Sequence, residues 1–171
     1  MSARDFSKIS PAIWRSRRFL GLETDAKLQF IYYATNEHVN SSGVYRLTDG
    51  YAVDDLGFQL DKYHQNRAIL IRAGMIDFDY EHSFLMVEGW FKHNPPMNGS
   101  HSAGTLRLIE KVKSERLREK VASFFAEADT LRLAREAKKK ADRDLKIARE
   151  RIEFPDAGSH LQRSLERTAR R

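Results

Sequence analysis

The sequence predicts a mostly helical α+β fold: a helix-turn-helix with a small β-hairpin, followed by a long charged C-terminal helical region. Three observations predict it. Apolar residues recur at helical spacing through much of the chain, two short segments have strand-like composition, and no proline or glycine interrupts residues 105–154. With 171 residues, 41% of them hydrophobic, the chain can form one modest core with an appendage.

A basic N-terminal arm, residues 1–20, precedes the first predicted helix. Thr24 suits an N-cap and Asp25 favours the first turn of this helix. The apolar stripe expected to face the core consists of Leu28, Ile31, Tyr32, Thr35 and Val39.

Two more helices are predicted after a short β-prone segment, Val44 to Leu47. Thr48 or Asp49 suits the cap of a brief helix that runs through Leu56, and Gly57 suits its end. Asp61 suits the cap of the next helix, which runs to Ala73 with Gly74 as its terminator. Two helices joined by a short turn that contains glycine form a helix-turn-helix candidate.

A β-hairpin is predicted after the third helix. Ile76, Phe78 and Tyr80 alternate with acidic residues, and a second apolar run covers 84–87. The complete order of elements is that of a winged helix, with residues 21–93 as the domain and the hairpin as its wing. Because three acids lie in 77–81, this wing is a poor clamp for phosphate.

The third helix carries the first set of candidate DNA contacts. In a winged helix this element normally lies in the major groove of double-stranded DNA, where glutamine can read adenine and arginine guanine. The candidates are Lys62, His64, Gln65, Arg67 and Arg72. A polar face is also typical of a solvated helix or of a protein-binding module, and we favour DNA binding over both.

Basic charge outside the third helix supplies the second set. Residues 105–171 hold 19 Lys and Arg against 12 Asp and Glu, whereas residues 1–104 hold 11 against 12, so the net charge of +6 comes from the C-terminal part. We expect phosphate contacts from Arg15, Arg17, Arg18, Arg135, Lys138, Lys139 and Lys140. For the run 135–143, a solvated helix face explains the pattern equally well.

Residues 94–104, rich in proline, glycine and asparagine, are predicted to form a linker to a charged helical region over 105–155. Ser114 suits the cap of its second helix. The seam Leu117, Val121, Phe124 and Leu131 has the spacing of a face that packs on a partner helix, which includes a homodimer. Residues 156–171 are predicted to be a disordered basic tail.

Catalytic motifs are missing from the sequence. It contains no phosphate loop, dinucleotide turn, zinc helix or nucleophile elbow, so we predict a protein that is not an enzyme and has no catalytic residues, metal or cofactor. We interpret His82, His93 and His101 as polar surface residues rather than metal ligands. The absence of cysteine and of a long apolar segment predicts no membrane partner and a cytoplasmic location.

Several segments together resemble a known family. They are Arg4-Asp-Phe-Ser-Lys-Ile-Ser-Pro-Ala-Ile-Trp14, Gly43-Val-Tyr45, Leu70 with Ala73-Gly-Met-Ile76, Val87 to Trp90, and His93-Asn-Pro-Pro96. Over residues 3–125 the chain resembles the winged-helix region of phage and prophage replication proteins of the replisome-organiser type, which are similar to DnaD-like helicase loaders. The resemblance implies binding at a replication origin and recruitment of the replicative helicase or its loader. The chain departs from that pattern by ending soon after a charged helix.

The sequence therefore predicts a phage or prophage DNA-binding protein that assists replication. Two alternatives stay open. One is a winged-helix transcriptional regulator that pairs through the Leu117 to Leu131 seam, and the other is a protein-interaction adaptor that has lost DNA binding.

Overall fold

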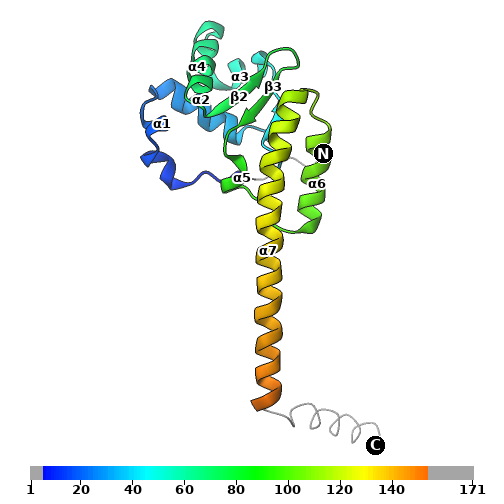
Figure 1. The fold of residues 1–171 in the computed structure, drawn as a ribbon. Coiled ribbons are helices and arrows are strands. Elements are labelled where there is room, and N and C mark those ends of the chain that lie inside the picture. The colour runs from blue at the N-terminus through cyan, green and yellow to red at the C-terminus, as the bar shows by residue number, and fades with distance from the viewer. Residues whose placement is uncertain (1–5, 154–171) are drawn as a thin grey trace, which may run out of the picture. The chain divides into compact units, whose positions relative to one another are not determined.

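The structure, a computed structural model, describes residues 6–153, and the chain divides after Arg132 into two units. Unit 1 contains all the strands and most of the helices of the described part (Figure 1). Its elements are η1 (Pro11–Arg15), α1 (Arg17–Leu20), α2 (Thr24–Thr35), β1 (Val44–Arg46), α3 (Asp49–Leu56), α4 (Leu60–Arg72), β2 (Ile76–Asp79), β3 (Phe84–Val87), α5 (Trp90–His93), α6 (Gly99–Glu110) and the first turns of α7 (Glu115–Glu153).

The three strands form one antiparallel sheet in the order β1-β3-β2. Val44 pairs with Met86 in one ladder, and Ile76 pairs with Val87 in the other. The Asp79 carboxylate accepts hydrogen bonds from the backbone N–H groups of Glu81 and His82 and so closes the turn between β2 and β3. The predicted mostly helical α+β fold and the predicted hairpin are confirmed.

The core lies between α2, α4 and the sheet. Tyr33, Tyr63 and Leu85 are fully buried there. The predicted inward stripe is wrong at Leu28 and Thr35, which are exposed, and confirmed in part at Ile31, Tyr32 and Val39, which pack in or against the core. The fully inward face of α2 is instead formed by Ala26, Phe30 and Tyr33. Hydrogen bonds explain the rotation: the buried Gln29 side chain donates to the Tyr33 hydroxyl and to the Tyr63 carbonyl, so a polar residue occupies the inward face.

Three helix ends were predicted correctly. Gly57 and Gly74 have φ values of 64° and 62°, the left-handed conformation that lets a glycine end a helix. The Ser114 hydroxyl accepts a hydrogen bond from the Leu117 N–H and caps α7.

Two predicted N-caps are wrong. Thr24 and Asp61 lie within the first turns of α2 and α4, and the N-cap positions are Glu23 and Gln59. Neither of these two residues caps its helix with a side-chain hydrogen bond.

The predicted domain boundaries differ from the observed ones. Phe19, within the predicted arm, is fully buried in the core of unit 1. The predicted linker 94–104 contains the start of α6, because the Asn98 side chain accepts a hydrogen bond from the His101 N–H and caps a helix that tolerates Gly99 and Gly104. The charged region 105–155 is divided at Arg132, and the predicted tail 156–171 lies outside the described residues.

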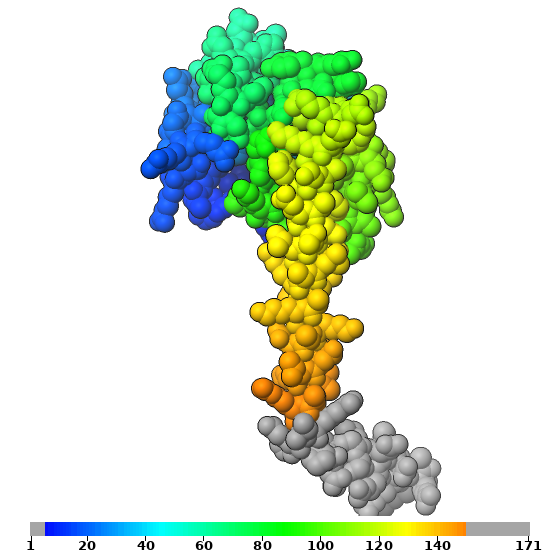
Figure 2. All heavy atoms as spheres, in the orientation of Figure 1, coloured from blue at the N-terminus to red at the C-terminus, as the bar shows by residue number. Residues whose placement is uncertain are grey.

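The predicted partner seam on α7 belongs largely to unit 1. Leu117 and Val121 are buried against their own chain, and the buried stripe continues through Phe125 and Ala128. Phe124 and Leu131, which the seam also included, are exposed. This buried stripe faces α5 and α6, through the ring contact of Phe91 with Phe125 and the hydrogen bond of Ser102 to Asp129. Figure 2 shows the first turns of α7, in yellow, against α6, in yellow-green.

Within residues 6–153, each helix is too short or too polar to cross a bilayer. The same residues contain no group of three or more His, Asp and Glu side chains arranged to hold a metal ion.

Candidate nucleic-acid interface

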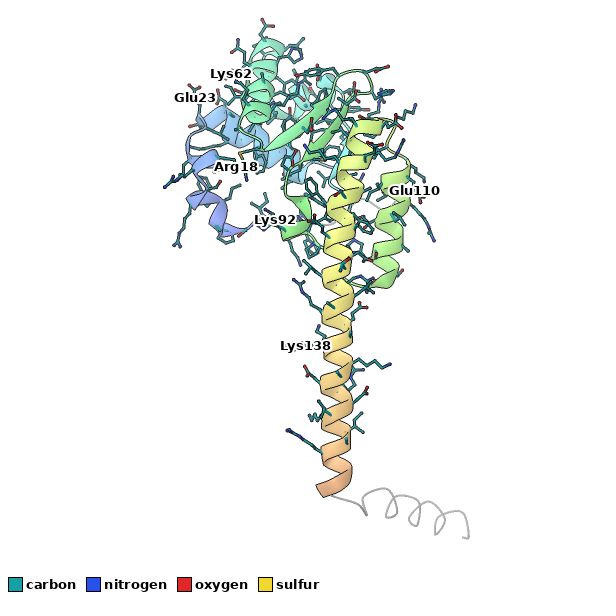
Figure 3. The ribbon with its side chains drawn as sticks, in the orientation of Figure 1. Arg18, Glu23, Lys62, Lys92, Glu110 and Lys138 are labelled. Carbon is teal, nitrogen blue, oxygen red and sulfur yellow. The ribbon has the colours of Figure 1, made fainter. Side chains whose placement is uncertain are left out.

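The predicted contact residues of α4 are divided between exposed positions and positions engaged with acids. Gln65 and Arg72 are exposed. The Lys62 ammonium lies 3.1 Å from the Asp25 carboxylate and 3.9 Å from that of Glu23, at the starts of α4 and α2 (Figure 3). The positive charge of Lys62 is therefore compensated by two acids of the same unit before any ligand binds.

Arg67 points inward, and its prediction as an outward DNA contact is wrong. Its side chain is 5% exposed, and its guanidinium donates a 2.6 Å hydrogen bond to Asp49 at the start of α3. The guanidinium carbon lies 4.2 Å from the ring centre of Phe78 and 5.2 Å from those of Tyr63 and Tyr80. Arg67 thus joins α3, α4 and the hairpin through one ion pair and three cation–π contacts.

His64 shares the same acid. Its Nε2 atom lies 2.7 Å from the second carboxylate oxygen of Asp49. Partial burial acts to raise the pKa of Asp49, but hydrogen bonds from His64 and Arg67 outweigh it and hold that pKa below its usual value. Asp49 therefore stays ionised and binds His64 and Arg67, which are two of the five α4 residues predicted to contact DNA.

The surroundings of α4 are acidic. Residues 21–93 contain 11 Asp and Glu against 6 Lys and Arg, a net charge of −5. Asp61 in the first turn of α4 and Asp54 and Asp55 on α3 are exposed. Gln65 and Arg72 remain available to a ligand, but the outward face of this helix is not the cationic face that the residue types alone indicate.

The acidic hairpin is partly neutralised by α7. Arg116 donates to both carboxylate oxygens of Asp77 at 2.7 and 2.9 Å, and Lys120 donates to one of them at 2.8 Å. Burial acts to raise the pKa of Asp77, and these hydrogen bonds lower it further than burial raises it. Glu81 at the tip stays exposed, so the predicted weakness of the wing as a phosphate clamp applies to the tip itself.

The N-terminal segment carries positive charge that pairs with no acid of residues 6–153. Residues 6–20 contain four Lys and Arg and no Asp or Glu, and Arg15, Arg17 and Arg18 are exposed. Arg18 donates a 2.8 Å hydrogen bond to the backbone carbonyl of Gly74, which places the segment beside the end of α4 (Figure 3). Arg18 therefore lies beside the end of α4, although 54 positions separate it from Arg72 in the sequence.

The second unit contains the other predicted basic residues. Arg135, Lys138, Lys139 and Lys140 lie on α7 and are exposed, as Figure 3 shows for Lys138. Residues 133–153 hold 8 Lys and Arg against 5 Asp and Glu. Each side chain over 133–149 is exposed, so the helix itself contributes no buried apolar face in this range.

An open groove of about 1270 Å³ between β1 and α6 forms a cationic surface that the sequence did not predict. Lys8, Arg46, Arg107 and Lys111 line it, and among the described residues around it Glu37 is the one acid. Lys8 and Arg46 are far from the other two in the sequence, and Arg107 and Lys111, four positions apart, follow a segment that we interpreted as a linker. Basic residues from three separate segments give no local signal, which is why only the fold shows the groove.

Some of the segments quoted for the resemblance contact one another in the structure through hydrogen bonds and side-chain packing. The backbone N–H of Lys8 donates to the Asn94 side chain, which in turn donates to the Lys8 carbonyl. Gly43 packs directly on the Trp90 ring, and the indole N–H donates to the Ser41 carbonyl. The chain matches no protein-family model, and no curated protein or solved structure shows a significant match to it.

Proposed function

We propose that the chain binds double-stranded DNA and acts as a replication accessory protein of a phage or prophage. The order α2, β1, α3, α4, β2, β3 and the antiparallel sheet support a winged helix over residues 21–93. The observation that carries the proposal is the N-terminal segment, whose exposed arginines form no ion pair with a carboxylate of the described residues and of which Arg18 contacts Gly74 at the end of α4.

The division of labour differs from the one that the sequence predicts. Arg15, Arg17 and Arg18 supply phosphate contacts, while Gln65 and Arg72 are the two α4 residues that remain free to reach base edges. The basic stretch of α7 adds affinity that does not depend on DNA sequence. The replication setting, including recruitment of the replicative helicase or its loader, rests on the resemblance of the quoted segments.

Fluorescence anisotropy of the full chain with a labelled duplex tests this proposal. Because each released counterion adds to the salt dependence, the affinity should fall steeply as salt rises. The double variant Arg15→Ala/Arg17→Ala should weaken binding roughly tenfold and flatten that dependence, since two phosphate contacts are lost. Lys92→Ala/Lys113→Ala removes the same charge from exposed positions elsewhere and serves as the matched control. Equal effects of the two variants, or binding that ignores salt, contradict the proposal.

A protein-interaction adaptor is the second candidate, and one observation favours it. The basic side chains of α4 at Lys62, His64 and Arg67 contact carboxylates, and residues 21–93 are acidic overall. Such a surface suits a basic protein partner better than DNA. Recovery of helicase with the chain after complete nuclease digestion, combined with no duplex binding, supports the adaptor.

The dimeric transcription regulator has less support. It depends on pairing through the predicted seam, and Leu117 and Val121 are buried in their own unit. Any pairing along α7 must therefore use other residues of that helix.

A further inference from the structure

We propose that the groove between β1 and α6 binds a single strand of DNA. This inference rests on the proposed function, DNA binding, and adds a second site that recognises a different state of the same polymer. A protein that opens or prepares a replication site meets both duplex and separated strands, so two sites on one chain have distinct ligands.

The walls of the groove are fixed by hydrogen bonds. The Thr105 hydroxyl on α6 donates to the Ser41 hydroxyl at 2.8 Å, which ties the helix to the loop before β1. The Ser102 hydroxyl donates to Asp129 on α7 at 2.6 Å and holds the other side of the same helix. Because α6 is anchored on both sides, Arg107 and Lys111, which are one helical turn apart, are held along one wall of the groove.

The groove cations are available for an anionic ligand. Arg46 at the end of β1, together with Arg107 and Lys111, is exposed, and none of the three forms an ion pair with any residue over 6–153. Lys8 adds a fourth positive charge and Glu37 a single negative one. Unpaired cations that converge on a recess attract a polyanion more strongly than the same residues paired with carboxylates.

The size and the apolar lining favour an extended strand over a small molecule. Small-molecule pockets have volumes of about 300–1,000 Å³, and this open groove of about 1270 Å³ exceeds them. Phe6 and Met97 are exposed at 63% and 68%, and Phe84 is partly exposed on β3. Aromatic faces beside a positively charged groove are the combination that binds single-stranded nucleic acid, because bases stack while phosphates follow the cations.

Duplex DNA fits this surface less well. Proteins read a duplex by inserting a protruding helix or β-ribbon into its grooves, whereas a recess excludes paired bases. An acidic peptide would satisfy the cations but would gain nothing from stacking on Phe84 and Phe6. The combined charge and aromatic lining therefore favours single-stranded DNA.

The test uses the full chain, a labelled oligo(dT) of about 15 nucleotides, which spans a typical single-strand site, and a labelled duplex in parallel. Arg107→Glu/Lys111→Glu should lower oligo(dT) affinity roughly tenfold or more, because two phosphate contacts become repulsive. Lys92→Glu/Lys113→Glu makes the same charge change at exposed positions that do not line the groove, and it should stay within about twofold of the parent. Arg46→Glu, a single change on the opposite wall, should weaken oligo(dT) binding in the same direction.

The outcomes separate this inference from the proposed function. Loss of oligo(dT) binding with duplex binding kept supports both. Duplex binding without oligo(dT) binding by the parent chain overturns the groove site and leaves the proposed function standing. Oligo(dT) binding that survives both groove variants also overturns it. Competition by poly-glutamate as effective as competition by unlabelled oligo(dT) assigns the groove to acidic peptides and overturns the single-strand site.

Discussion

The surface of α4 and the groove beside α6 contain similar numbers of basic residues, but these residues differ in whether they pair with carboxylates. On α4, Lys62, His64 and Arg67 are each within 4 Å of a carboxylate. In the groove, Arg107 and Lys111 have no acidic partner in the part of the chain that the structure describes. The comparison shows that the number of basic residues on a face does not measure the positive charge that a ligand meets. Neighbouring carboxylates can neutralise that charge within the folded chain.

The two regions also use their basic residues for different purposes. Arg67 stabilises the junction of α3, α4 and the hairpin, so its charge is part of the fold. Arg107 and Lys111 contact solvent, and their removal costs the fold little. Substitutions should therefore change stability at α4 and binding in the groove.

The largest expected effect is at the Arg67 junction. Arg67→Ala leaves Asp49 with only His64 and removes three aromatic contacts, so we expect the free energy of unfolding to fall by about 3 kcal/mol. Gln65→Ala, two residues away on the exposed face, should change it by less than about 0.5 kcal/mol. Urea denaturation followed by circular dichroism measures both. Near-equal losses of stability in the two variants would contradict the claim that Arg67 is part of the folded core rather than of the ligand-accessible surface.

A slightly smaller effect is expected where the groove wall is anchored. Gly43 has φ 69°, and a Cβ there would overlap the Trp90 ring, whose N–H holds Ser41 on the groove wall. Gly43→Ala should lower the free energy of unfolding by about 2–3 kcal/mol, through backbone strain and displacement of the indole. Gly50→Ala is the control, since a Cβ at that position of α3 meets no atom within 4 Å. A neutral Gly43→Ala variant contradicts this account of the wall.

The pairing of Asp77 with α7 makes a pH-dependent contribution. Because folding lowers the pKa of Asp77, the pair stabilises the protein above the unfolded-state pKa of about 3.9, and this contribution is lost as the pH falls through and below that value. Asp77→Asn should lower the free energy of unfolding by about 1 kcal/mol at pH 7. The difference from the parent should shrink toward pH 3. Denaturation series across this range test the sign, and a difference that grows on acidification contradicts it.

The smallest effect concerns the partners of Lys62. Glu23→Gln/Asp25→Asn releases Lys62 from both acids and should raise duplex affinity about two- to threefold if α4 approaches DNA, because one exposed charge is worth less than about 1 kcal/mol. Glu110→Gln, an exposed acid on α6, is the single-charge comparison. Unchanged duplex affinity in the α2 variant indicates that DNA stays away from the start of α4.

Local signals explain which parts of the fold could be predicted. Gly57, Gly74 and Ser114 act through the backbone next to them, so these three helix ends were predicted correctly. The inward face of α2 was not, because Gln29 occupies it through hydrogen bonds to α4 that no sequence pattern shows.

The candidate site was harder to predict for the same reason. The sequence shows which residue types lie on α4. It does not show that Asp49, 18 positions before Arg67, pairs with that arginine in the folded chain. The groove cations come from three separate segments, so their convergence depends on tertiary structure.

Photo-crosslinking of the full chain to an oligonucleotide that carries 5-bromodeoxyuridine, followed by mass spectrometry of the peptides, tests the central claim most directly. The account predicts that crosslinked single strands map to peptides around Phe84, Met97 and Arg107, with the crosslinks reduced in the Arg107→Glu/Lys111→Glu variant. Crosslinks confined to residues 58–72 and unchanged in that variant would contradict it, since the bound strand would then lie on α4, where Lys62, His64 and Arg67 already contact carboxylates.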